Sequence, residues 1–473
     1  MKGLFVIINP QIISKVLDAA LATGADFAEV FLEDTYSSDL MLFNGSPKNA
    51  IVGQMYGAGI RLFFDKEQIY VTTNNVTEAG LIKAAQDAAS ARPANAQTLL
   101  KNKPKTALPL EEVTFDQIHV YGNKPWDQSR EKKNKILVSL DQEARAVSSL
   151  VTQVETRLLE KNQIIQVANS MGVMALEERS YLRIFVTVFV EDQGKKEHGY
   201  ESTGWLGTFE EVEKVDLKTL AQTAAKTALS SLNAGYAPAG EMPVILNNGF
   251  GGVIFHEACG HGLETTSVAK GSSVFCNLLG EKIAHECVTA IDDGTLPNAW
   301  GSLCVDDEGR LTQKTVLIEN GILKSYLVDE LGSRKTGYAP TGSARRQSYK
   351  LAPTSRMRNT FIAPGTESLE QMISDVDYGL YAAKMGGGSV SPGTGEYNFS
   401  VIEAYVIRNG QLKERVKGAS LIGKGIETLG RIVKVGSDLQ MANGMCGSIS
   451  GSIPVTVGQP PLMVSQILVG GRS

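Results

Sequence analysis

The sequence predicts an α+β protein in which N-terminal α/β segments precede a β-rich, antiparallel C-terminal domain. Helical and strand-like runs alternate in the first half, whereas strand-like runs separated by Gly-rich loops dominate the second half. Two Asn-Gly pairs, at 320–321 and 409–410, each lie between apolar runs. Asn-Gly in this setting is a strong hairpin signal because both turn residues need a positive φ.

Several domains are expected, since 473 residues exceed the ~250–300 at which a single core stops growing. We predict an N-terminal α/β domain over residues 1–100, a middle α/β segment over 110–236, and a C-terminal β-rich domain over 240–473. The boundaries are set at two linkers, the polar, proline-containing stretch 93–109 and the short stretch 237–241.

The elements of the first half follow from periodicity and from start and stop signals. A helix is predicted from Pro10 to Thr23, because its apolar residues recur at helical spacing and Gly24 follows its end. Thr77 is a suitable N-cap for a second helix. Further helices are predicted over 129–147 and 216–232, and strand-like runs over 27–33, 39–43, 59–64, 68–73, 150–161 and 180–192.

Composition excludes some classes of function. The net charge of -5 argues against a nucleic-acid partner, which would require a basic face. The five cysteines show no CxxC spacing, and their odd number favours a reducing compartment. No signal peptide or membrane-spanning run is recognised, so we expect a cytoplasmic protein without a membrane partner.

One segment, GFGGVIFHEACGHGLE, contains a dense cluster of metal-binding residues: His256, Glu257 and His261. The pattern is similar to the HExxH zinc-peptidase helix, but its second histidine is five residues after the first. On an ideal helix this spacing separates the two imidazoles by about 140°, compared with about 40° for HExxH. We therefore predict that the helix widens or ends near Gly260.

A catalytic metal site normally has three protein ligands and one open position. Sequence chemistry leaves the third ligand open among Glu264, His285, Cys259 and Cys446, the last in a loop of small residues. The competing interpretation is that both histidines are ordinary core or surface residues.

Nearly the whole chain resembles the TldD/PmbA family, and in particular its TldD-like branch. The resemblance is carried by FGGVIFHEACGHGLE and by a long N-terminal segment, GAGIRLFFDKEQIYVTTNNVTEAGLIKAAQDAA. It is also carried by IDDGT, VDDEG, TGSARRQSY, RMRNTFI, GTGEYNFSVIEAYVIRNG and the loop around Cys446.

The resemblance implies a zinc-type metallopeptidase subunit that cleaves unfolded or extended peptides. It implies His256, His261 and Cys446 as ligands of Zn²⁺, and Glu257 as the catalytic base. It also implies pairing with a TldE/PmbA-like subunit, with a homodimer as the alternative. Two other interpretations are a non-catalytic scaffold or modulator subunit of a larger complex, and a hydrolase that cleaves a different bond.

Overall fold

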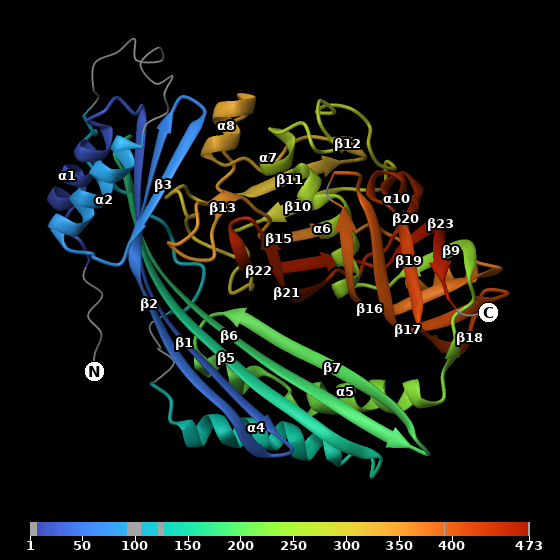
Figure 1. Ribbon diagram of the computed structural model, residues 1–473. Coiled ribbons are helices and arrows are strands. Elements are labelled where there is room, and N and C mark those ends of the chain that lie inside the picture. The colour runs from blue at the N-terminus through green and yellow to red at the C-terminus, as the bar shows by residue number, and fades with distance from the viewer. Residues whose placement is uncertain (1–6, 92–105, 122–126, 392, 472–473) are drawn as a thin grey trace.

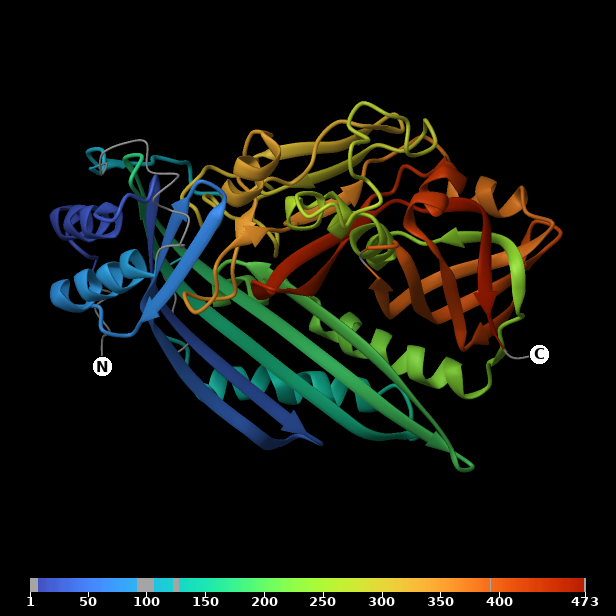
Figure 2. The same ribbon diagram turned by 45° about the horizontal axis from the view of Figure 1, so that its top comes forward.

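The computed structural model describes residues 7–91, 106–121, 127–391 and 393–471. A long, curved sheet occupies one side of the molecule, and a β-rich body formed by residues 240–471 lies against its concave face (Figures 1 and 2). No helix among the described residues is both long and apolar enough to cross a membrane. The predicted α+β class is confirmed.

The long sheet has seven strands in the order β3-β2-β1-β5-β6-β4, with β7 paired to β6. Its neighbouring strands pair antiparallel, with the exception of β4 and β6, which pair with each other in parallel. The strands are β1 (Phe27–Phe43), β2 (Ser46–Phe64), β3 (Glu67–Thr73), β4 (Glu111–Glu112), β5 (Val151–Asn169), β6 (Val173–Asp192) and β7 (Lys195–Leu206).

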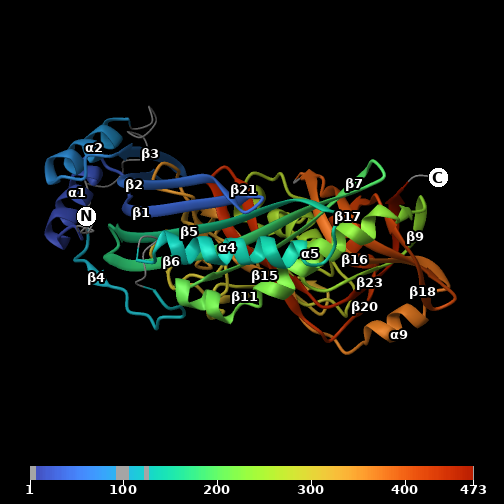
Figure 3. The same ribbon diagram turned by 90° about the horizontal axis from the view of Figure 1, so that it is seen from below.

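Four helices cover one face of the long sheet: α1 (Pro10–Leu21), α2 (Glu78–Ser90), α4 (Arg130–Arg145) and α5 (Leu217–Leu232). Ala28, Val30 and Leu32 of β1 pack in the core under α1 and α2, while Leu40 and Leu42 pack in the core under α4 and α5. All five residues have even numbers, and alternate side chains of a strand face opposite sides of a sheet, so these five side chains point to the same face. Both helix pairs therefore lie on the same face, one at each end (Figure 3).

The opposite face of the long sheet contacts the C-terminal body through buried charges. Glu29 of β1 pairs with Arg61 at 2.5 Å and with Arg346 of the C-terminal body at 2.8 Å, and all three side chains are fully buried. Arg179 of β6 pairs with Asp307 of that body at 2.7 Å. Complementary buried charges thus fix how the two parts of the molecule face each other.

Two larger sheets form the C-terminal body. The six-stranded sheet has the order β12-β11-β10-β15-β22-β21, and the eight-stranded sheet contains a closed ring of five strands, β16-β9-β23-β19-β17, closed by pairing of β16 with β17. Their strands are β8 (Gly235–Tyr236), β9 (Gly240–Leu246), β10 (Ala290–Asp293), β11 (Lys314–Glu319), β12 (Ile322–Leu323), β15 (Asn359–Ile362), β16 (Tyr378–Ser391), β17 (Glu396–Arg408), β18 (Gln411–Lys417), β19 (Ala419–Lys424), β20 (Ile432–Val435), β21 (Gln440–Ser448), β22 (Gly451–Gln459) and β23 (Leu462–Gly470). A separate two-stranded sheet consists of β13 (Ala344–Arg345) and β14 (Thr354–Ser355).

Short helices fill the spaces beside these sheets. They are α6 (Val253–Ala258), α7 (Thr265–Val268), α8 (Glu330–Thr336), α9 (Leu369–Ser374) and α10 (Gly425–Arg431), with 3-10 turns η2 (Gly249–Gly252) and η3 (Gly260–Leu263). A further 3-10 turn, η1 (Phe209–Lys214), packs in the core with α4 and α5. The largest apolar core of the molecule lies in this body and includes buried residues of α6, β9, β16, β17 and β23.

Both predicted Asn-Gly hairpins are confirmed. Asn320 and Gly321 join β11 to β12 with φ values of 49° and 80°, and Asn409 and Gly410 join β17 to β18 with φ values of 49° and 72°. Thr77 caps α2 by accepting a hydrogen bond from the amide of Gly80. The four predicted helices of the first half are also present.

The separate strands predicted over 27–33 and 39–43 are wrong, because one strand, β1, runs through both. The polar residues between the two runs pair with β2 on one side and with β5 on the other, which keeps the backbone extended. The predicted three-part division of the chain stays a prediction. The long sheet takes strands from both the first and the second predicted parts, and most of the predicted linker, 93–105, lies outside the described residues.

Candidate metal centre

The helix that carries the first histidine ends early. α6 stops at Ala258, Cys259 has φ −124° and ψ −50°, and the 3-10 turn η3 begins at Gly260. A Cβ on Gly260 would lie 2.2 Å from the sulfur of Met357, so no side chain fits there without displacing Met357. The predicted helix distortion at Gly260 is confirmed.

The break in the helix brings the two imidazoles together. The ring centroids of His256 and His261 lie 5.3 Å apart, with the rings nearly perpendicular at 83°. Cys446 of β21 completes the group, because its sulfur lies 3.2 Å from Nε2 of His261. One donor atom from each of the three residues lies within 4.8 Å of the other two, and all three residues are buried.

The position of Cys446 depends on the pairing of β21 with β22, in which Cys446 lies opposite Ile453. Arg356, which is fully buried, donates a hydrogen bond of 2.6 Å to the carbonyl of Cys446. Strand pairing and this buried guanidinium together hold the thiol in place. Arg356 belongs to the RMRNTFI block, in which no local pattern indicates a contact with Cys446.

Glu264 lies behind His261 and outside the group of donor atoms. Its Oε2 lies 3.0 Å from Nδ1 of His261, and its Oε1 accepts a hydrogen bond from the amide of Met357. A carboxylate in this position holds a proton on Nδ1 and orients the ring so that Nε2 faces Cys446. Glu264 was one of four open alternatives for the third ligand, and its contact with the far side of His261 instead gives it an orienting role.

The other two alternatives are not part of the group. Cys259 is buried next to Gly425, and burial raises the pKa of its thiol. Nδ1 of His285 lies 3.1 Å from the sulfur of Cys287. Among the described residues, the group at this site therefore contains Cys446 and neither Cys259 nor His285.

Glu257 lies on the solvent-exposed side of the three donor residues. Its Oε2 is 3.6 Å from Nε2 of His261, and its side chain is 29% exposed, compared with 11% for that of His261. A carboxylate that reaches solvent beside buried donor atoms can exchange protons with a water molecule at the site.

The group stabilises a thiolate next to an imidazolium. Burial alone would raise the pKa of Cys446, but His256 and His261 beside it lower that pKa to about 3. Burial alone would likewise lower the pKa of His261, but Glu264 and Cys446 raise it well above the ordinary value.

The donor set fits a zinc ion. Both ring nitrogens of His256 are buried and have no hydrogen-bond partner among the described residues, an arrangement that is costly unless the ring binds something. One thiolate and two imidazoles are typical ligands of zinc, and three protein ligands leave one position open.

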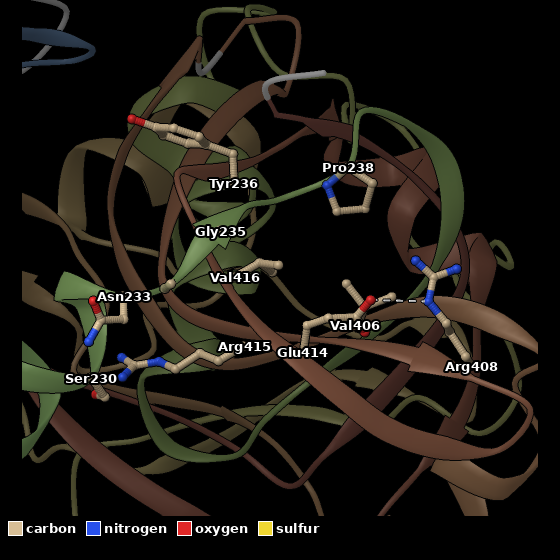
Figure 4. A pocket seen from close by; sticks show the side chains of 11 residues that line it. Ser230, Asn233, Gly235, Tyr236, Pro238, Val406, Arg408, Glu414, Arg415 and Val416 are labelled. Carbon is tan, nitrogen blue, oxygen red and sulfur yellow. Dashed lines mark hydrogen bonds and ion pairs between the residues drawn. The ribbon is translucent and has the colours of Figure 1, made fainter.

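A cavity of about 370 Å³ lies between the long sheet and the β21–β22 pair. Met445 lines this cavity, and since alternate side chains of a strand face opposite sides, Cys446 faces away from it. A second cavity, of about 580 Å³, lies between the end of α5 and β8, β17 and β18, where Arg408 and Glu414 form an ion pair (Figure 4). None of the four predicted site residues lines this second cavity.

Three family models match the chain along most of its length. They describe a PmbA/TldA metallopeptidase domain 1 over residues 28–92, a central domain over 123–232 and a C-terminal domain over 239–471. The last range contains all three donor residues of the group.

Two metalloproteases of other organisms are similar to this chain in sequence. A metalloprotease TldD homolog of Buchnera aphidicola is 34% identical over 473 residues, covering 98% of this chain and 96% of its own. A zinc metalloprotease TldD homolog of Saccharolobus solfataricus is 33% identical over 257 residues, covering 54% of this chain and 57% of its own.

Solved structures show the same fold at low sequence identity. TldE from Thermococcus kodakarensis is 18% identical, with a TM-score of 0.74, over 97% of this chain and 100% of that one. A Bacteroides thetaiotaomicron protein, provisionally described as a modulator of DNA gyrase, is also 18% identical, with a TM-score of 0.76, over 98% of this chain and 99% of that one.

Proposed function

The chain belongs to the PmbA/TldD metallopeptidase family, and from this premise we propose that it is a metal-dependent peptidase acting on unfolded or extended peptides, with Glu257 as the general base. One observation carries the proposal. His256, His261 and Cys446 converge from distant parts of the chain, and a partly exposed carboxylate lies beside them.

We assign His256, His261 and Cys446 as the ligands of a zinc ion. When bound, zinc acts as a Lewis acid that polarises the scissile carbonyl and lowers the pKa of the attacking water. Glu257 accepts a proton from that water and later delivers it to the leaving amine. Glu264 holds His261 in the tautomer and orientation that this arrangement needs.

An extended peptide fits the free edge of β16. On one side β16 pairs with β17 along its length, whereas on the other side its described pairing with β9 covers only Leu380 to Ala382. Residues 387–391 are mostly exposed, and α6 lies against both β16 and β17. An unfolded peptide can pair its backbone with such an edge, while a folded protein offers no free strand.

The end strand β21 is less accessible to a peptide. The indole nitrogen of Trp300 donates to the carbonyl of Gly444 at 2.9 Å, and Arg183 donates to the carbonyl of Asn443 at 3.1 Å. These side chains already occupy carbonyls that a peptide strand would need.

The working assembly is proposed to be a dimer with a TldE/PmbA-like subunit or, alternatively, with a second copy of this chain. The similarity in fold to TldE from Thermococcus kodakarensis supports a partner of the same overall shape. Light scattering of the purified chain, with and without a co-expressed partner, distinguishes these two assemblies.

Substitution of Glu257 tests the proposed mechanism. Glu257→Gln is expected to lower the cleavage rate of an unfolded peptide by at least ~10²-fold, the usual contribution of a general base, while bound zinc stays at the wild-type level. His256→Ala, His261→Ala and Cys446→Ala are expected to lose zinc and activity together, because each removes a direct ligand.

The assay includes any co-expressed partner, so that an incomplete assembly is not mistaken for inactivity. Full cleavage by Glu257→Gln would refute the mechanism. A wild-type protein that neither binds zinc nor cleaves would favour the scaffold interpretation instead.

A further inference from the structure

A second group of metal-binding side chains is buried where the long sheet meets the C-terminal body. One donor atom each from His119, Glu177 and Cys304 lies within 4.8 Å of the other two. The three residues come from the segment 106–121, from β6 and from the loop between β10 and β11. No residue of this group belongs to the metal centre described above.

His119 has a ring nitrogen that nothing in the described chain satisfies. The residue is 5% exposed, and its Nε2 lies 2.9 Å from the carbonyl of Glu178, so Nε2 carries the proton that it donates to this oxygen. Nδ1 is buried and has no hydrogen-bond partner among the described residues. Burial lowers the pKa of His119, which keeps the ring neutral and leaves a lone pair on Nδ1 for a ligand.

Cys304 and Glu177 are held together by the backbone. The amide of Cys304 donates to Glu177 Oε1 at 2.7 Å, and the thiol of Cys304 lies 3.6 Å from Oε1 of Gln117. Burial, and secondly Glu177, raises the pKa of this thiol to about 12. The thiol therefore keeps its proton at neutral pH unless a cation displaces it.

The charge balance of the ion pairs formed by Arg179 favours a cation. Arg179 pairs with Glu177 and Asp307, each at 2.7 Å, so these three side chains carry one net negative charge. A divalent cation that displaces the thiol proton of Cys304 adds one net positive charge, two from the ion minus one from the thiolate. The group then becomes electrically neutral in a buried setting, where an uncompensated charge is costly.

We propose that His119, Glu177 and Cys304 form a second, structural metal site for a thiolate-binding divalent cation such as zinc. Gln117 offers an amide oxygen within reach as a fourth donor. The ion displaces the proton of Cys304, which passes to solvent. All three residues are less than a tenth exposed, as in closed structural sites, and the bound ion ties the segment 106–121 and the C-terminal body to the long sheet.

Metal analysis of a protein whose first site is removed tests the proposal independently of peptidase activity. The His256→Ala/His261→Ala variant, loaded with Co²⁺ and dialysed, is expected to retain about one equivalent and to show a thiolate-to-cobalt absorption band in the near ultraviolet. Adding Cys304→Ser should abolish both signals. Adding Cys287→Ser should abolish neither; this control cysteine also has a histidine nitrogen nearby but belongs to no described three-donor group.

Two results would overturn the proposal: no bound Co²⁺ in the His256→Ala/His261→Ala variant, or full retention after Cys304→Ser. If Cys304→Ser fails to fold, His119→Gln in the same background replaces it and should also lose the ion. The zinc content of the wild-type chain provides a further measurement, read together with that of the His256→Ala/His261→Ala variant. Two equivalents of tightly bound Zn²⁺ support the second site, and a total of one, with none left after removal of the first site, contradicts it.

Discussion

Oε2 of Glu264 lies 3.0 Å from Nδ1 of His261, and the sulfur of Cys446 lies 3.2 Å from Nε2 of the same ring. One imidazole thus connects a buried carboxylate to the candidate metal centre. Ring nitrogens that ligate a metal are commonly oriented by such a carboxylate on the far side of the ring, so removal of the carboxylate should weaken metal binding without removing a ligand.

Glu264→Ala is therefore expected to lower zinc affinity by about 10- to 100-fold. Competition with a chromophoric chelator measures the affinity. Glu264→Gln is the matched control, because its amide oxygen can still accept the proton of Nδ1 and should preserve more of the affinity. Equal affinities in Glu264→Ala and in the wild type would show that His261 needs no orienting partner.

Gly260→Ala is expected to reduce the zinc content and to destabilise the fold by ~1–3 kcal/mol, the usual cost of overpacking a core. The reason is that the new methyl group would lie 2.2 Å from the sulfur of Met357, directly before His261. Urea denaturation and metal analysis measure the two effects.

Gly430→Ala is the control for this prediction, since Gly430 lies in α10 with no atom within 4 Å of an added Cβ. That change is expected to be neutral or slightly stabilising. The double variant Gly260→Ala/Met357→Ala should recover part of the zinc content if the sulfur contact is the cause, and an unchanged loss would point elsewhere.

The stability of the metal-free protein should increase as the pH rises from about 3 to ~6.5. In the folded state the lowered pKa of Cys446, about 3, and the raised pKa of His261 leave a single proton on the pair. The unfolded chain carries two protons on these groups below the ordinary histidine pKa of ~6.5, so it binds more protons and stability rises with pH. Between ~6.5 and the ordinary cysteine pKa of ~8.5 the unfolded chain also carries one proton, and this contribution is constant.

Urea denaturation of chelator-treated protein at several pH values measures this dependence. The pair contributes a slope of at most ~1.4 kcal/mol per pH unit. Cys446→Ser should reduce the slope, because serine forms no anion at these pH values. Parallel profiles of the two proteins would show that Cys446 keeps its proton when no metal is bound.

Limited proteolysis should cut first within residues 93–109, the longer of the two predicted linkers. The shorter linker, 237–241, should resist cleavage, because Ala237 is fully buried and its amide donates to the carbonyl of Lys417. Mass spectrometry of the first fragments identifies the site. Initial cleavage inside 320–410 would contradict the proposed domain boundary.

The sequence predicted those features that depend on neighbouring residues. The Asn-Gly turns and the cap at Thr77 follow from local backbone conformation, and the break at Gly260 follows from the five-residue spacing of the two histidines. Residue chemistry alone left the third donor open, because Cys446 lies 185 residues after His261 and only strand pairing brings the two together.

Other features depended on partners that are distant in sequence. The single long strand β1 was predicted as two strands, since its polar middle looks like a turn until β2 and β5 are seen to pair along it. His119, Glu177 and Cys304 come from three separate segments, and no local motif marks them as a group. In both cases the information lies in contacts across the fold.

The distance along the chain between the two halves of the metal centre also sets the time at which the site can form. Cys446 is placed by the hairpin of β21 and β22, so His256 and His261 have no thiol partner until residue 459 has been synthesised and the hairpin has paired. On the proposed ligand set, a nascent chain on the ribosome still lacks the third ligand of the zinc ion. The order of synthesis therefore keeps a growing chain from cleaving its own unfolded N-terminal segments, which are peptides of the kind that the finished enzyme is proposed to cleave.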